Sequence, residues 1–375
     1  MRVAGFYHSL ESDWNHGNAH FLRGIASELI ARGHKVDIYE PSDAWSRENL
    51  IREYGEEPIA AFRARYPHLH STRYDTASLD LDQVLDGIDV VLVHEWNEPE
   101  LVRRIGLHHR ANGRYLLFFH DTHHRSVTDP DSMSRYDLSG YDGVLAYGEA
   151  IREIYLQRGW AGQVWTWHEA ADTRVFRPHP EIERDGDVVW VGNWGDDERT
   201  AELQEFLFDP VRMLGLSAGV YGVRYPEAAL QKLREYGINF GGWLPNYHVP
   251  ETFARFRVTV HVPRRPYAEA LRGIPTIRPF EALACGIPLI SAPWEDSEGL
   301  FTEGRDFLRA RNGSEMRKHL RDVLSDKSLA ASLAAHGRQT ILTRHSCAQR
   351  VDQLLSIIAR LSTSAASNQL IMEHA

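Results

Sequence analysis

The segment that says most about this chain runs from Arg272 to Ser291 and reads RGIPTIRPFEALACGIPLIS. Proline is tolerated in a helix only within the first turn, so Pro275 and Pro279 confine the start of a short helix to the residues between them. Gly286 is a natural C-terminal stop for that helix. The apolar run that follows it, up to Ser291, predicts a buried strand.

The start of this helix is a candidate anion site. The first backbone N–H groups of a helix have no partner within it, and Arg278 adds a full positive charge beside Thr276 and Ile277. Glu281 lies about one turn further along, where a carboxylate can accept hydrogen bonds from vicinal hydroxyls. Phosphate at one end and ribose at the other is the layout of a nucleotide pocket. The alternative for Glu281 is structural, since it can cap its own helix or pair with Arg278.

The composition predicts a folded protein large enough for two domains, with 375 residues of which 43% are hydrophobic. A net charge of −10 argues against nucleic acid or a membrane surface as the main partner. Only Cys285 and Cys347 are present, which excludes a disulfide framework or a cysteine-rich metal site. No apolar run approaches the ~20 residues that span a bilayer, and the first residues lack a signal-peptide core. A cytoplasmic protein without a transmembrane segment is therefore expected.

Strands and helices alternate twice along the chain. The first series opens with a strand over Arg2–Tyr7, a helix that ends at Gly33 and a strand over Lys35–Tyr39, which together form a βαβ unit. A second series begins at residue 188, after a linker-like stretch at 171–187. The other predicted strands are 89–93, 115–119, 143–147, 188–191, 219–223, 258–262 and 288–291, and the other predicted helices are 150–158, 198–208, 231–236, 314–324 and 328–361, the last broken near 343–346. This order predicts an α/β fold of two doubly wound domains, with ligands at the carboxyl ends of strands and in the cleft between domains.

Cationic loops of the second series follow two of its predicted strands. The loop from Gly192 to Arg199 follows the strand at 188–191, contains Asn193 and opens a helix, and Arg264 and Arg265 follow the strand at 258–262. Taken singly, each loop reads as an ordinary corner with solvated arginines. Because the carboxyl ends of parallel strands share one sheet edge, these loops and the helix start converge there, which predicts a diphosphate site.

The first series offers two loops at the same kind of edge. Asn15, His16 and Gly17 follow the first strand, and the glycine permits close approach to a ligand, although an ordinary turn explains these residues as well. His120 and Asp121 end another strand, where such a pair can donate hydrogen bonds or shuttle a proton. A hydrogen-bonded structural histidine is the alternative for His120.

Histidines in the first series do not predict a metal centre. His120, His123 and His124 lie close together in sequence, but no coordinating partner pattern is visible elsewhere. His94 and Glu95 after the strand at 89–93 are a further candidate for the edge of the cleft.

On these motifs the chain resembles the GT-B glycosyltransferases, and specifically the CgeB-like branch, which is named for a spore-maturation protein and carries a group 1 type donor-binding domain. The resemblance is strongest over residues 188–350, in the segment 276–290 and in the pattern from Gly337 through His345 to Arg350. It implies two Rossmann-like domains that face each other across a cleft. The implied boundaries are 1–175 for the acceptor-side domain, 186–345 for the donor domain, 346–362 for a helix that crosses back to the first domain, and 363–375 for a tail.

The resemblance also implies roles for residues. Glu281 matches the glutamate that commonly binds the donor ribose, and the segment Thr276–Arg278 matches the one that binds the diphosphate. Arg199 and Arg264 or Arg265 are similar to the basic groups on the donor phosphates, and His120 matches a histidine that faces the transferred sugar. The chain departs from the pattern at Gly273, where many retaining members carry a second glutamate, eight positions before Glu281.

The expected activity is therefore transfer of a hexose-like sugar from a nucleotide-diphosphate sugar to an acceptor in the cleft, with retention and without metal or another cofactor. A UDP-sugar is the favoured donor, His120 and Asp121 are the catalytic candidates, and the acceptor is a glycan, a small molecule or a protein. Two alternatives remain open from sequence. A nucleotide-sugar 2-epimerase would convert the donor without an acceptor, and a non-catalytic sugar-nucleotide-binding protein would neither transfer nor hydrolyse it.

Overall fold

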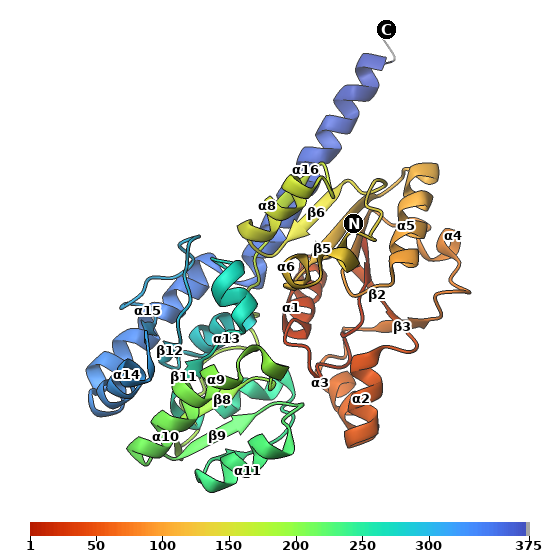
Figure 1. Cartoon of the computed structure of the whole chain (residues 1–375). Coiled ribbons are helices and arrows are strands. Elements are labelled where there is room, and N and C mark those ends of the chain that lie inside the picture. Colours follow the sequence, from red (N-terminus) through yellow and green to blue (C-terminus); the bar gives the residue numbers. More distant parts are fainter. Residues whose placement is uncertain (373–375) are drawn as a thin grey trace.

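The computed structural model describes residues 1–372, and it divides the chain between two parallel β-sheets with helices on both faces (Figure 1). The first sheet has the strand order β3-β2-β1-β4-β5-β6-β7 and the second the order β10-β9-β8-β11-β12-β13. Every pair of neighbouring strands in these sheets is parallel. The predicted α/β fold of two doubly wound domains is confirmed.

The strands of the first sheet are β1 (Arg2–Phe6), β2 (Lys35–Pro41), β3 (Ser71–Tyr74), β4 (Val90–His94), β5 (Leu116–Asp121), β6 (Gly143–Ala146) and β7 (Val164–Thr166). Its helices are α1 (Ala19–Ala31), α2 (Trp45–Tyr54), α3 (Glu57–Arg65), α4 (Leu81–Val84), α5 (Pro99–Asn112), α6 (Arg125–Thr128), α7 (Pro130–Met133) and α8 (Glu149–Arg158). All side chains of β4 are buried because the central strands are covered on both faces.

The strands of the second sheet are β8 (Gly186–Val191), β9 (Ala218–Tyr221), β10 (Asn239–Phe240), β11 (Phe256–His261), β12 (Leu289–Ser291) and β13 (Leu308–Arg309). Its α-helices are α9 (Thr200–Leu203), α10 (Asp209–Leu214), α11 (Glu227–Glu235), α12 (Val249–Ala254), α13 (Ile277–Cys285), α14 (Gly313–Ser325) and α15 (Lys327–Arg344). Short 3-10 turns η1 (Asp196–Glu198) and η3 (Asn246–His248) and π turns η2 (Gln204–Phe208) and η4 (Pro266–Ala270) complete this part.

The sequence prediction missed the outermost strands of both sheets. These are β3 and β7 in the first sheet and β10 and β13 in the second. Each is short and carries exposed or half-buried positions, so the apolar run that marked the inner strands is lacking. The helix predicted over 198–208 is also wrong in detail, since it is a succession of η1, α9 and η2 that continues into α10.

The last helix, α16 (Cys347–Met372), connects the end of the second sheet to the first domain (Figure 1). The break predicted near 343–346 falls at His345 and Ser346, where Ser346 pairs with Ala171. Val351 and Leu354 of α16 pack with Phe21 and Ile25 of α1 in one buried cluster. The helix also covers residues 363–372 of the predicted tail, and residues 373–375 lie outside the described residues. The domain boundaries themselves stay predictions.

Among residues 1–372, we find no helix that is both long enough and apolar enough to cross a bilayer.

Candidate functional site

A cavity of ≈160 Å³ lies between the two domains at the carboxyl ends of their strands. The first domain contributes the loop after β1 and residues that follow β4 and β5. The second contributes the ends of β8 and β11, the loop after each of them, and the start of α13. The lining residues are Asn15, His16, Gly17, Asn18, Trp96, Thr122, His123, Trp190, Val191, Gly192, Asn193, Arg199, His261, Pro263, Arg264, Tyr267, Thr276, Ile277 and Arg278.

Helix α13 begins where the two prolines were expected to place it, with Thr276 before its first residue, Ile277. Thr276 has φ 61° and ψ 179°, a backbone region that is essentially reserved for glycine. The helix ends at Gly286, whose φ of 66° gives the left-handed stop. The strained entry directs the start of α13 into the cavity, and the residues Thr276, Ile277 and Arg278 all line it.

The first-domain loop approaches this helix start closely. A Cβ atom at Gly17 would lie 3.0 Å from Cγ2 of Ile277, so glycine allows the two domains to meet here. Asn15 of the same loop has φ 52°, and its buried Oδ1 has no hydrogen-bond partner among the described residues. His16 shares a hydrogen bond between its Nδ1 and Ser9 Oγ at 2.8 Å. Burial, reinforced by Arg23, lowers the pKa of His16 to about 3, so its ring is neutral.

Three arginines bring positive charge to the other side of the cavity. Arg199 donates to the carbonyls of Trp194 and Val262, and no carboxylate pairs with it in the described part of the chain. Burial and the neighbouring Arg264 lower the pKa of Arg199 to about 9. Arg264 pairs with Glu198 at 3.2 Å, and Arg278 pairs with Glu281. A buried cation without a paired carboxylate is costly in a folded protein, so the cavity favours an anion.

Arg265 and Asn193, which were predicted as donor contacts, take different positions. Arg265 does not line this cavity and instead pairs with Glu202 at 3.0 Å beside a separate hollow of ≈350 Å³. Asn193 lines the cavity, and its Oδ1 accepts a hydrogen bond from the backbone N–H of Val223 at 3.0 Å. This bond ties the loop after β8 to the loop after β9.

Glu281 is fully buried behind the cavity lining. One carboxylate oxygen lies 2.9 Å from Nδ1 of His20, in the first domain, and the other accepts from Arg278. The structural alternative, pairing with Arg278, is therefore present in this conformation. The predicted contact with a ribose requires these partners to make room.

His120 and Asp121 lie at the end of β5 but do not line the cavity. Nδ1 of His120 is 3.0 Å from the hydroxyl of Tyr7, and burial lowers the pKa of His120 to about 3. Asp121 accepts hydrogen bonds from the Tyr155 hydroxyl at 2.8 Å and from the backbone N–H of His123 at 3.0 Å. Burial raises the pKa of Asp121 to about 6. The hydrogen bonds of His120 and Asp121 thus fix the end of β5 from inside the first domain.

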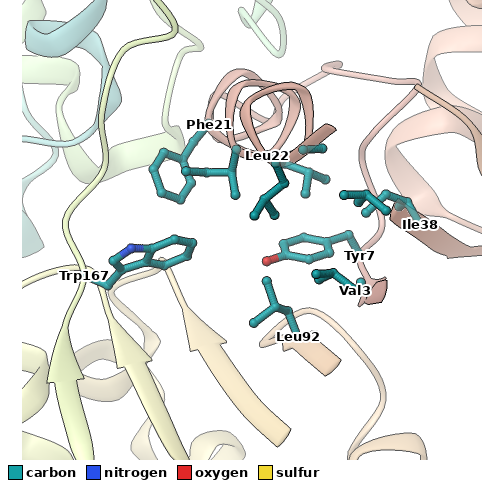
Figure 2. Close-up of a pocket in the computed structure, with 12 residues that line it drawn as sticks. Val3, Tyr7, Phe21, Leu22, Ile38, Leu92 and Trp167 are labelled. Carbon is teal, nitrogen blue, oxygen red and sulfur yellow. The ribbon is translucent and has the colours of Figure 1, made fainter. Parts of the chain in front are cut away.

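Figure 2 shows the interior of the first domain around Tyr7. The Tyr7 hydroxyl points toward Trp167, among Phe21, Leu22 and Leu92, around a gap of ≈10 Å³. The lining is almost entirely apolar and the gap is about the size of one water molecule. This is a packing defect under α1, and the chemistry belongs to the cavity between the domains.

Sequence reasoning missed several residues that line the cavity. His123 stood in the loop that was considered only for metal, and His261 lies within the strand predicted over 258–262 without having been considered as a site residue. Trp96, Trp190 and Tyr267 carry no motif and are brought to the site by the fold alone. Within residues 1–372, no cluster of three or more histidine, cysteine or acidic side chains is arranged to hold a metal ion.

Comparison with known proteins agrees with this architecture. Residues 199–356 match the family model described as "Glycosyl transferase-like". A search of curated proteins found no significant match.

Three solved structures are similar over nearly the whole chain. Sucrose-phosphate synthase from Thermosynechococcus elongatus is 16% identical with a TM-score of 0.66, and the match covers 97% of this chain and 100% of that one. Anabaena HepE in complex with UDP and glucose is 14% identical with a TM-score of 0.68, over 96% and 99% of the two chains. An alpha-glucosyltransferase in complex with UDP and DNA is 11% identical with a TM-score of 0.70, over 96% and 99%. The chain has the GT-B fold, and the comparisons together support a GT-B glycosyltransferase.

Proposed function

We propose that this chain is a glycosyltransferase of the CgeB-like branch that moves a sugar from a nucleotide-diphosphate sugar to an acceptor bound between its two domains. The observation that carries the proposal is the cavity where Arg199, Arg264 and Arg278 gather at the start of α13. Arginine suits the recognition of phosphate oxygens, and a helix start favours negative charge. The match of residues 199–356 to a glycosyl transferase-like family supports the same function.

The donor diphosphate binds at the segment Thr276–Arg278, with Arg199 and Arg264 on the facing loops. HepE and the alpha-glucosyltransferase are both described in complex with UDP, which supports uridine as the base. Glu281 binds the ribose after its contacts with His20 and Arg278 open. Gly17 and its neighbours in the first domain then close on the transferred sugar.

The chemistry follows from where charge develops. The bond between the anomeric carbon and the diphosphate oxygen breaks, and a bond forms between that carbon and the acceptor hydroxyl oxygen. The proton of the acceptor passes to an oxygen of the departing diphosphate. Fixed cationic side chains stabilise the negative charge on the leaving group, which is the role of preorganised electrostatics in catalysis, and the proposed reaction therefore needs no metal ion. Because the acceptor hydroxyl gives its proton to the departing diphosphate, it attacks the anomeric carbon from the same face, and the proposed reaction is retaining.

Domain motion is part of the proposal. The cavity of ≈160 Å³ is smaller than the ~300–1,000 Å³ that is usual for ligand pockets, so a donor enters an open form and the closed form excludes water. The Tyr7–His120 and Asp121–Tyr155 bonds hold the first-domain strand ends during this motion. A direct catalytic role for His120 and Asp121 stays a prediction.

The test is a donor screen followed by a transfer assay. We expect UDP and UDP-glucose to raise the thermal midpoint of the protein, because a ligand that binds the folded state stabilises it. Isothermal calorimetry then gives affinities with and without a chelator, which we expect to be equal. Donor incubated alone tests the epimerase alternative, and acceptor mixtures test transfer. A protein that binds no nucleotide sugar, or one that epimerises the donor alone, would contradict the proposal.

A further inference from the structure

His261 ends β11, lines the cavity and is held by a chain of hydrogen bonds that fixes its tautomer. The hydroxyl of Ser291 on the neighbouring strand β12 donates its one hydrogen to the carbonyl of Ala292 at 2.8 Å. Nδ1 of His261 lies 2.9 Å from the same Ser291 oxygen. Because that hydroxyl hydrogen is already used, Nδ1 must carry the proton and donate it to Ser291. Nε2 is left with a free lone pair.

The free Nε2 has no hydrogen-bond partner among the described residues, although the side chain is only 3% exposed. Buried polar atoms are almost always paired, so an unpaired one beside a cavity points to a ligand. Burial, together with Arg199 and Arg278, lowers the pKa of His261 to about 3, which keeps the ring neutral at physiological pH. Nε2 is therefore a hydrogen-bond acceptor on a residue that lines the cavity.

A hydrogen-bond acceptor that lies among arginines restricts which chemical groups of a ligand can bind to it. The oxygens of a diphosphate that is bound as an anion carry no hydrogen to donate, so Nε2 cannot bond to them. A hydroxyl can donate to Nε2 while its own oxygen accepts from a neighbouring cation. The position therefore suits a hydroxyl group next to the phosphate subsite.

We propose that Nε2 of His261 accepts a hydrogen bond from a hydroxyl of the transferred sugar and thereby makes the site prefer the complete nucleotide sugar over the free nucleotide. The inference rests on the proposed function, because it takes the cavity to be the donor site. It adds a residue that determines sugar specificity, on the strand next to the one that carries Trp190 and Val191. Ser291 is a positioning residue, which acts by holding the tautomer.

Two substitutions of His261 test the roles of its two ring nitrogens separately. In His261→Asn the amide takes the place of Nδ1 and keeps a donor for Ser291, but nothing replaces Nε2. In His261→Gln the longer amide reaches the place of Nε2 and restores an acceptor. Calorimetry with UDP and with UDP-glucose, on both variants and the unaltered protein, gives the ratio of the two affinities. We expect His261→Asn to lose roughly tenfold in affinity for UDP-glucose with little change for UDP, and His261→Gln to recover most of that loss.

The outcomes distinguish this inference from the proposed function. If the unaltered protein binds neither UDP nor UDP-glucose, the donor site itself is contradicted and the inference falls with it. If the unaltered protein binds both and His261→Asn binds them with unchanged affinities, only the inference is overturned. An equal loss for UDP and UDP-glucose would place the contact on the nucleotide and would also overturn it. Ser291→Ala, which keeps Nε2 but frees the ring to exchange tautomers, is expected to lower the ratio by less than His261→Asn.

Discussion

Glu281 of the second domain accepts a hydrogen bond from Nδ1 of His20 in the first, over 2.9 Å. The tautomer is fixed, because Nε2 of His20 accepts the backbone N–H of Asp172 at 2.8 Å and Nδ1 therefore carries the proton. The His20 ring also stacks on Phe176, with ring centroids 3.9 Å apart. The residue predicted to bind the donor ribose thus joins the two domains in this structure.

This relationship predicts different effects for its two partners. Glu281→Ala removes both the domain contact and the proposed ribose contact, so we expect it to lower UDP affinity by tenfold or more, since a charged hydrogen-bond acceptor is lost (about 1.5–3 kcal/mol). His20→Ala leaves Glu281 in place but removes the domain contact together with the bond to Asp172 and the stacking on Phe176, so it is expected to lower the thermal midpoint while UDP binding is kept. Calorimetry and thermal unfolding of both variants check this. If both variants bind UDP as the unaltered protein does, Glu281 serves only the domain interface.

Two adjacent arginines offer a matched test of the phosphate subsite. Arg264 lines the cavity, whereas Arg265 lies outside it and pairs with Glu202. We expect Arg264→Ala to weaken UDP binding by about tenfold, in line with a charge-assisted hydrogen bond to phosphate, and to have little effect on uridine. Arg265→Ala serves as the control and should leave both affinities unchanged. A larger loss in Arg265→Ala than in Arg264→Ala would show that the phosphates bind elsewhere.

The sequence predicted the inner strands, α13 and the gathering of Arg199, Arg264 and Arg278 because each rests on a local rule. Apolar runs mark strands that are buried on both faces, proline and glycine bracket α13, and parallel strands bring their carboxyl ends to one edge. These rules depend only on residues close together in the sequence or on the order of the strands, so they can be applied to the sequence alone.

The rest depends on contacts between segments far apart in the chain. The bond between His20 and Glu281 joins residues from different domains, and no local pattern marks it. His120 was expected at the cleft, but the position of its ring depends on the hydroxyl of Tyr7, which follows strand β1. Nε2 of His261 can be identified as a free acceptor only from the hydrogen bonds that join Nδ1 of the ring to Ser291 and Ser291 to Ala292. The missed edge strands lack the buried faces on which the apolar pattern depends.

Gly273, where a second glutamate was missing from the sequence pattern, has no room for one. Its φ is 91°, and a Cβ atom there would lie 2.7 Å from Cγ of Glu298 and 2.8 Å from Oγ of Ser297. Glu298 cannot move freely, because it accepts from the backbone N–H of Glu149 at 2.9 Å and contacts His168 at 2.6 Å. In the proposed function, a contact to the sugar hydroxyls would therefore have to come from other residues.

We expect Gly273→Ala to lower the free energy of unfolding by more than Gly299→Ala. Gly299 also has positive φ, at 62°, but nothing lies within 4 Å of a Cβ built there. The control therefore reports the strain of a positive φ without a clash, about 1 kcal/mol. The difference between the two variants reports the clash together with the added strain of the larger φ at Gly273. Urea unfolding measures both. Equal losses in the two variants would mean that the Glu298 segment moves aside, and Gly273→Glu would then merit a test of sugar binding.

Glu169, in the segment after β7, is a buried carboxyl group with no hydrogen-bond partner for either oxygen in the described part of the chain. Burial raises the pKa of Glu169 well above its ordinary value of 4.5, and the nearby negative charge of Glu281 raises it further, against a smaller opposing effect of Arg278. The folded protein therefore holds a proton on Glu169 at pH values where the unfolded chain has released it.

The stability of the folded state therefore falls as the pH rises above 4.5. Above pH 4.5 the unfolded chain gains stability by losing the proton, so the folded state is progressively destabilised until the pH passes the raised pKa, by about 1.4 kcal/mol for each unit between the two pKa values. Glu169→Gln places a neutral group of the same shape there and removes the titration. We expect the variant to match the unaltered protein near pH 4.5 and to unfold at a higher temperature at pH 8.

The control is Glu183→Gln, at an exposed position, which should leave the unfolding temperature unchanged at both pH values. Parallel pH profiles for Glu169→Gln and the unaltered protein would show that Glu169 is ionised in the folded state, and a partner for it would then have to be sought across the domain interface, beside Arg278.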